Sequence, residues 1–163
     1  MTTVTPPRAL VVRSGSADSR ALLSTRYSVL AGADETGGAL CLLEMEAPPA
    51  GAPPMHLHEH DGEGFVVLAG AMDVVVEGEA TRLEPGGTHA KSPGVAHSFA
   101  PCPGGVRALV ITAPAGFERF VRTAGVPCAG TGLPPEGPPP DPAAMAAMAA
   151  RHGITVLGPP PAA

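Results

Sequence analysis

Three histidines and three carboxylates fall within eight residues, from His56 to Glu63, although charged residues make up only 15% of the chain. If this stretch begins as a strand, His56 and His58 project from one face with Cα atoms roughly 6.5–7 Å apart. Two imidazoles on one face, with Glu63 five residues later, can converge on one metal ion. Taken alone, the stretch also fits a solvated loop that happens to be rich in histidines and acids.

Other polar residues near this stretch have less defined roles. We expect Glu59, His60 and Asp61 on an exposed loop at the mouth of the site, because Asp61 has the opposite strand parity to His58. For His60 and Asp61, a hydrogen bond that supports a metal ligand is the alternative. His89 occurs in a short strand, where it either lines the interior or faces solvent. His152 lies near the end of a predicted helix and is given no part in the chemistry.

Short apolar segments separated by turns surround the histidines. Gly and Pro, 21 of each, punctuate the chain every few residues. This spacing predicts an all-β sandwich or barrel. The expected strands cover residues 39–46, 64–68, 72–77, 80–83, 88–91, 97–100 and 106–112, with a break at 69–70 and a loop at 101–105.

Helical patterns follow the predicted strands. In residues 115–124, Phe117, Phe120 and Val121 are spaced as one face of a helix. Residues 127–142 read as a Pro/Gly linker, and Asp141 before Pro142 is a favourable start for a helix over 143–151. A last strand is expected at 154–157. We therefore expect a barrel with its following helix over residues 1–126, and a linker, helix and tail that pack on the barrel over 127–163.

Charge, hydropathy and cysteine content narrow the partners and the cellular compartment that we expect. The net charge is −5 and the chain has no Lys/Arg run, which argues against nucleic-acid binding. No apolar stretch approaches the length of a membrane span, so no membrane partner is expected. Three cysteines without metal-like spacing favour a reducing compartment, and the N-terminus has no signal-peptide pattern. We expect a cytoplasmic protein.

Two segments resemble the paired motifs of the cupin superfamily. The first reads Gly51…His56-x-His58-x4-Glu63-x6-Gly70, and the second reads Gly86-x5-Ser92-x-Gly94-x2-His97. The resemblance implies a double-stranded β-helix, or jelly-roll, barrel with short C-terminal helices. It also implies that one divalent metal is bound by His56, His58, Glu63 and His97.

Further segments resemble small cupins that are grouped with quercetinase-like dioxygenases, namely residues 36–38, 114–120 and 153–160. This resemblance implies a dioxygenase that acts on a phenolic, enol or dicarbonyl small molecule, with Glu63 as a ligand and as the base for a substrate hydroxyl. Two alternatives stay open: a cyclase or isomerase acting on a polyketide-like intermediate without O2, and a non-catalytic cupin that binds a small molecule or only stores metal.

The ligand types do not select one metal. Three imidazoles and a carboxylate suit Fe, Ni, Mn, Co, Cu or Zn, whose affinities follow the general divalent order. A metal bound only for stability is a further possibility. Because small cupins commonly pair through edge strands, which also protects those edges from aggregation, we expect a homodimer.

Overall fold

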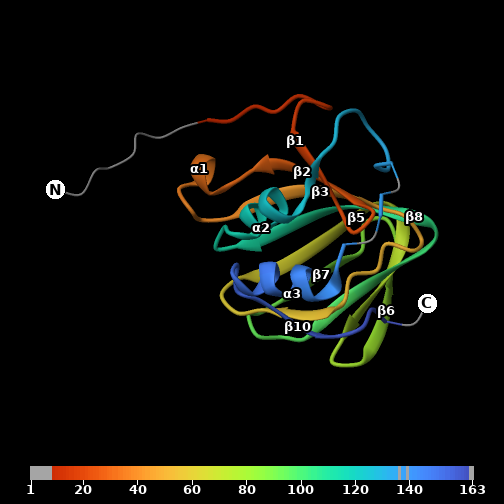
Figure 1. Ribbon diagram of the computed structural model, residues 1–163. Helices are drawn as coiled ribbons and strands as arrows, with labels where there is room; N and C mark the ends of the chain where they lie inside the picture. The colour runs from red at the N-terminus through yellow and green to blue at the C-terminus, as the bar shows by residue number, and fades with distance from the viewer. Residues whose placement is uncertain (1–8, 136, 139, 162–163) are drawn as a thin grey trace.

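Strands are the main regular structure of this computed structural model, which describes residues 9–135, 137–138 and 140–161 (Figure 1). The strands are β1 (Asp18–Leu22), β2 (Thr25–Ala31), β3 (Cys41–Ala47), β4 (Met55–His58), β5 (Gly62–Val76), β6 (Glu79–Leu83), β7 (Thr88–Lys91), β8 (His97–Ala113), β9 (Val126–Pro127) and β10 (Ile154–Gly158). The helices are α1 (Ala33–Thr36), α2 (Phe117–Ala124) and α3 (Pro142–Ala150). The predicted all-β class is confirmed.

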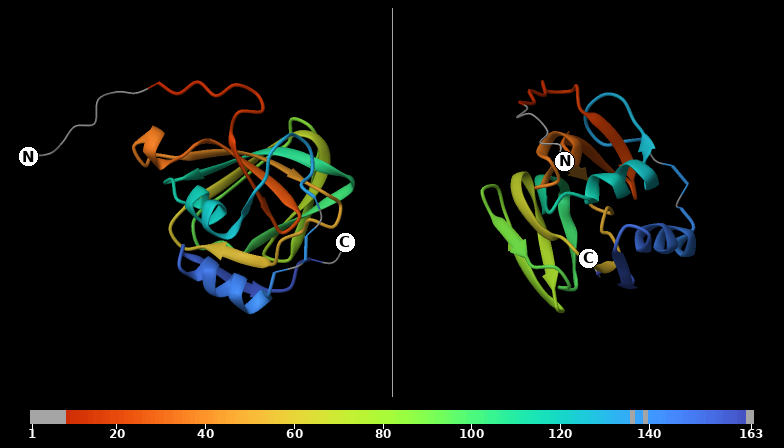
Figure 2. Two further views of the ribbon diagram at one scale, coloured as in Figure 1. Left: turned by 45° about the horizontal axis from the view of Figure 1, so that its top comes forward. Right: turned by 90° about the vertical axis from the view of Figure 1, so that its left-hand side faces the viewer.

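The strands form one antiparallel sheet that curls into a barrel (Figures 1 and 2). Its main path runs β10-β4-β8-β3-β2-β1-β9, and β5 adds pairings with β6, β7 and β8. Strand β5 pairs with β8 along almost its whole length. Because β8 also pairs with β3 and β4, it connects the two sides of the barrel and positions residues from both against one interior.

The long strands β5 and β8 bend together at two glycines. Gly70 and Gly105 both have positive φ, 71° and 77°. A Cβ at Gly70 would lie 2.2 Å from the carbonyl oxygen of Gly105, so neither bulk nor ordinary backbone angles are tolerated there. The predicted break at 69–70 and loop at 101–105 are therefore wrong: both strands continue through these residues, because positive-φ glycines bend the pair without ending it.

The core follows strict alternation along the strands. In β3, Cys41, Leu43, Met45 and Ala47 are buried while the intervening residues are partly exposed. The first half of β5 alternates in the same way, burying Glu63, Phe65 and Val67. A carboxylate therefore occupies an interior position in line with core side chains, which needs a compensating partner.

Two helices and the last strand lie along the barrel. In α2, Phe117, Phe120 and Val121 are buried, which confirms the predicted apolar face. The Asp141 carboxylate accepts hydrogen bonds from the Ala143 and Ala144 amides and so caps α3 as predicted. Strand β10 pairs with β4, next to α3, so the end of the chain adjoins the strand that carries two of the three clustered histidines (Figure 2). No helix of the described residues is long and apolar enough to cross a membrane.

Candidate metal centre

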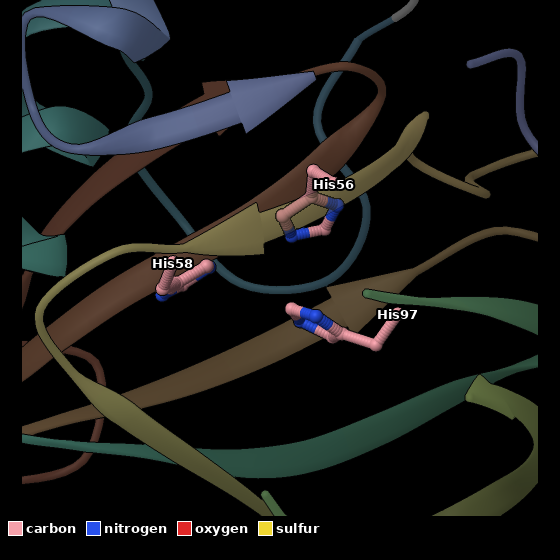
Figure 3. A group of neighbouring side chains, drawn as sticks. All are labelled: His56, His58 and His97. Atoms are coloured by element: carbon pink, nitrogen blue, oxygen red, sulfur yellow. The ribbon is translucent and has the colours of Figure 1, made fainter. Parts of the chain in front are cut away.

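Three histidines from two strands converge inside the barrel (Figure 3). Strand β4 supplies His56 and His58 on one face, as their spacing predicts, and β8 begins at His97. His56 and His97 are register partners across the β4–β8 pair, and their ring centroids are 4.4 Å apart. One ring nitrogen from each of the three residues lies within 4.8 Å of the others, close enough to hold one metal ion.

Hydrogen bonds fix the orientation of all three rings. Nδ1 of His56 lies 2.7 Å from the Pro54 carbonyl oxygen, and Nδ1 of His97 lies 3.1 Å from that of Val95. Nδ1 of His58 lies 2.7 Å from Oδ2 of Asp61. Carbonyl and carboxylate oxygens only accept hydrogen bonds, so each Nδ1 is the protonated nitrogen and each Nε2 is left for another partner.

The Nε2 atoms fit a metal ligand set. Nε2 of His58 is buried with no hydrogen-bond partner among the described residues. Such an orphan is costly unless a ligand satisfies it. Histidines that bind metals through one nitrogen usually donate the other N–H to a carbonyl or a carboxylate, as all three do here. The donor types and their orientation therefore suit a divalent transition metal.

Glu63 lies beside two of these nitrogens. Its Oε2 is 2.7 Å from Nε2 of His97, and its Oε1 is 3.9 Å from Nε2 of His58. An unprotonated imidazole nitrogen and a carboxylate would both be acceptors, so the shorter contact requires a proton or a metal cation. The structure thus places Glu63 next to the three-histidine cluster, in contact with His97, while the cluster itself consists of His56, His58 and His97.

The electrostatics of the site keep Glu63 and His56 in metal-binding forms. Burial of Glu63 would raise its pKa, but the nearby His58 and the hydrogen bond from His97 outweigh it and lower the pKa to about 2. Burial, together with the neighbouring His97, lowers the pKa of His56 to about 4. At neutral pH the site therefore presents an ionised carboxylate and a neutral His56, whose lone pair is available to a cation.

A largely apolar cavity opens beside the cluster. His56, Glu63 and His97 line it from the metal side, and two hydroxyl-bearing residues of β2, Thr25 and Tyr27, line it elsewhere. Its apolar wall includes the aromatic residues Phe65, Phe99, Phe117 and Phe120 together with Met145, Ala149, Ile154 and Val156 from α3 and β10. This arrangement suits a small, largely apolar molecule with a few oxygens.

The surroundings of the cluster agree only in part with the sequence-based expectations. His60 is exposed, as expected, with 78% of its side chain accessible. The expectation for Asp61 is wrong: it is buried and bonds His58, because β4 ends at His58 and the turn brings Asp61 back beneath the ring. His89 is turned inward and lies against the Phe65 ring.

Sequence reasoning missed three further residues. Lys91 is buried with its Nζ unpartnered among the described residues. Thr25 and Tyr27 lie far from the histidines in the sequence, and no motif marks them. The one available signal is a period of two in β2: Thr25, Tyr27 and Val29 are two residues apart and all three are buried. This spacing could have predicted that Thr25 and Tyr27 face the interior.

Comparison with known proteins agrees with the cupin resemblance. Residues 43–112 match the family model of the cupin domain. With its antiparallel barrel, the chain has the cupin fold and resembles small cupins. Its sequence resembles quercetinase-like members: quercetin 2,3-dioxygenase of Bacillus subtilis (strain 168) is 27% identical over 126 residues, which are 77% of this chain and 37% of that protein. The matched region thus spans well under half of that relative.

Solved structures share the fold. An RmlC-like cupin from Shewanella frigidimarina NCIMB 400 has a TM-score of 0.60 at 17% identity, over 69% of this chain and 96% of that one. The polyketide cyclase RemF from Streptomyces resistomycificus has a TM-score of 0.57 at 23% identity, over 66% and 80%. At these identities the likeness extends to the fold alone, and it agrees with the expected cupin barrel.

Proposed function

We propose that this cupin is a metal-dependent dioxygenase acting on a phenolic, enol or dicarbonyl small molecule. His56, His58, Glu63 and His97 would hold one divalent transition metal. The observation that carries the proposal is the convergence of three imidazoles, each anchored through Nδ1, beside an apolar cavity that two of them, His56 and His97, line together with Glu63. When bound, the metal would act as a Lewis acid toward substrate oxygen and provide a place for O2.

The residues of the chain would bind and orient the substrate. The aromatic wall would exclude water and pack against a flat apolar body, and the side of the cavity lined by His56 and His97 would receive its oxygens. Glu63 is the one carboxylate among the described cavity-lining residues, so it is the candidate acceptor for the proton of a substrate hydroxyl. Its low pKa keeps it ionised, and its contact with His97 must loosen before it takes that proton.

The dioxygenase assignment draws on the match to quercetin 2,3-dioxygenase. A cyclase or isomerase acting on a polyketide-like intermediate would use the same cavity and ligands, without consuming oxygen. Oxygen uptake separates the two reactions: metal-loaded protein is mixed with flavonols and β-dicarbonyl compounds while dissolved O2 and products are followed. We expect uptake in step with substrate loss. Turnover of the same compounds under strict anaerobiosis would contradict the dioxygenase and favour the cyclase.

The ligand assignment has its own test. His58→Ala is expected to remove most bound metal in elemental analysis of the purified protein. His60→Ala is the matched control, because it deletes an exposed histidine two residues away and should retain the metal content of the unaltered protein. Full metal occupancy in His58→Ala would refute the ligand set, and equal loss in both variants would point to a general loss of structure.

We also propose that the protein is a cytoplasmic homodimer. Its three cysteines are free, as a reducing compartment requires, and Cys41 and Cys102 are buried. Strand β6 pairs with β5 alone in the described sheet, so its other edge is available to a second copy. Light scattering coupled to size exclusion should give twice the chain mass, and a monomer at micromolar concentration would contradict this assembly.

A further inference from the structure

Two hydroxyl groups stand apart from the metal centre on the cavity wall. Thr25 and Tyr27 are two residues apart on β2, so their side chains project to the same interior face. Thr25 is 1% exposed and Tyr27 is 7% exposed. Between them, Arg26 points to the other face, where it bonds carbonyl groups of residues 128–132. Strand β2 is therefore held in place behind the cavity.

Thr25 has an unmet hydrogen-bonding capacity. Its Oγ1 is inaccessible to solvent and has no hydrogen-bond partner among the described residues. Buried hydroxyl groups are rarely left in this state, because the lost hydration is then uncompensated. Gly51 lines the cavity next to it, and a Cβ at Gly51 would lie 3.2 Å from Oγ1. A side chain at position 51 would therefore crowd the threonine hydroxyl.

Tyr27 is suited to donate a hydrogen bond. Burial, reinforced by the negative charge of Glu63, raises the pKa of its phenol, so the O–H stays protonated. Its ring packs edge-on against Phe117 with centroids 5.9 Å apart, which limits its rotation. The phenol and Glu63 line the same cavity. A donor and an ionised acceptor thus lie at one cavity, where a hydroxyl and a carbonyl of one molecule can be bound together.

We propose that Thr25 and Tyr27 form a second oxygen-binding subsite that sets substrate specificity. The Tyr27 hydroxyl donates to the substrate oxygen nearest Glu63, and the Thr25 hydroxyl bonds a further hydroxyl or carbonyl that is remote from the metal. Apart from the metal-side residues, these two are the polar side chains among the described cavity-lining residues. The substrate is therefore an apolar, ring-containing enol or phenol that carries an additional oxygen. This inference rests on the proposed function and narrows its substrate class.

Matched ligands test the role of Thr25. Two flavonols are used, one with only the hydroxyl beside its ketone and one with a single additional hydroxyl on the remote ring. Binding to zinc-loaded protein is measured by calorimetry, so that no oxygen chemistry is required. We expect the unaltered protein to bind the hydroxylated flavonol about five- to tenfold more tightly. Thr25→Val, which keeps the shape of the side chain, should abolish this difference, and Thr25→Ser should restore it.

Tyr27→Phe should lower the affinity for both flavonols to the same extent, because both carry the oxygens that bind beside Glu63. Ser28→Ala is the control, since it removes a hydroxyl from the opposite face of β2, where Ser28 contacts Ser19. Metal content is measured in every variant and should not change. Equal affinities of the unaltered protein for both flavonols, binding of neither, or a difference that survives in Thr25→Val would each overturn the subsite. A water molecule that satisfies Thr25 would give the first or the last of these results.

The binding test of the Thr25 subsite can succeed or fail independently of the proposed dioxygenase activity. Discrimination by Thr25 without any oxygen uptake would leave the subsite standing and remove the dioxygenase. Oxygen uptake on both flavonols at equal affinity would retain the dioxygenase and remove the subsite.

Discussion

Lys91 lies directly opposite Glu63 on the paired strands β7 and β5, and its buried amine has no hydrogen-bond partner among the described residues. Burial lowers the pKa of Lys91, and the negative charges of Glu63 and Asp61 counteract this effect. A lysine in this position balances two carboxylates when the metal site is empty. Once a divalent cation binds, the ammonium group lies close to a second positive charge, which opposes binding.

We therefore predict that Lys91→Met binds divalent metal more tightly, by about 1 kcal/mol or roughly fivefold, at an effective dielectric constant typical of proteins. Competition with a chromophoric chelator measures the affinity. Thermal stability should stay the same or rise, because an unpartnered buried amine is replaced by an apolar side chain. Lys91→Arg, which retains the charge, should not show the gain. Weaker metal binding by Lys91→Met would mean that the lysine supports the ligands.

Asp61 orients His58 through the hydrogen bond to Nδ1. Asp61→Asn removes the charge and allows the amide to present a donor to the ring, so His58 loses both its orientation and part of its basicity. We predict a loss of about 10–100-fold in metal affinity, as is usual when such supporting groups are changed. The exposed neighbour Glu59 provides the control variant, Glu59→Gln, which should bind metal normally. Unchanged affinity in Asp61→Asn would assign Asp61 a structural role only.

The sequence predicted the positions of the histidines better than those of the residues around them. His56 and His58 fall on one face because a period of two holds inside a strand, and β4 ends only at His58. The same rule failed for Asp61, which lies in the turn beyond the strand, where alternation has no meaning. To place Lys91 and Tyr27 at the site, one must know which strands are neighbours in the sheet. Pairing across the sheet is a long-range property that local patterns do not encode.

The two long strands illustrate the same limit. The expected break at 69–70 and loop at 101–105 rest on the rule that glycine and proline interrupt most strands. Gly70 and Gly105 instead lie where β5 and β8 bend together, and the carbonyl of one residue occupies the space that a side chain of the other would need. A single chain position gives no information on whether its partner strand bends at the same point.

Glu118 links the start of α2 to the start of α1. Its carboxylate accepts hydrogen bonds from the backbone amides of Ala33 at 3.0 Å and Gly116 at 2.8 Å. Burial would raise its pKa, but the hydrogen bonds from backbone amides outweigh burial and hold the pKa below the ordinary value of 4.5. The ionised form is therefore favoured by folding. This contribution is complete above the unfolded pKa and is lost as the pH falls through the folded pKa.

We predict that Glu118→Gln lowers the free energy of unfolding by about 2 kcal/mol at neutral pH, because an amide cannot accept both bonds as strongly. The difference should shrink as the pH falls below 4.5, where the unaltered carboxyl also becomes protonated. Urea denaturation at several pH values measures it. Glu44→Gln, which breaks only a surface ion pair with Arg107, should cost less than about 1 kcal/mol. A difference that is independent of pH would exclude the ionised form as the source.

Arg26 holds the segment after β9 against the barrel. Its guanidinium donates hydrogen bonds to the carbonyls of Cys128 at 3.4 Å, Ala129 at 3.3 Å and Gly130 at 3.2 Å, and also to that of Gly132. The Arg26 side chain is buried. These bonds gather a Pro/Gly-rich segment with few apolar contacts, and that segment leads to α3, whose Met145 and Ala149 line the cavity. This attachment supports our proposal that a linker, helix and tail over residues 127–163 pack on the barrel.

Arg26→Met should release the segment while leaving the barrel folded. We predict faster amide hydrogen exchange over residues 128–135 and in α3, with little change in β3, β5 and β8, because segments with few buried contacts open locally before the whole protein unfolds. Mass spectrometry of peptic fragments resolves these regions. Arg20→Met is the matched control, since the Arg20 side chain pairs with Asp18 and, among the described residues, makes none of the hydrogen bonds that join Arg26 to residues 128–132. Exchange in α3 that matches the unaltered protein would show that β10, paired with β4, holds the C-terminal unit without Arg26.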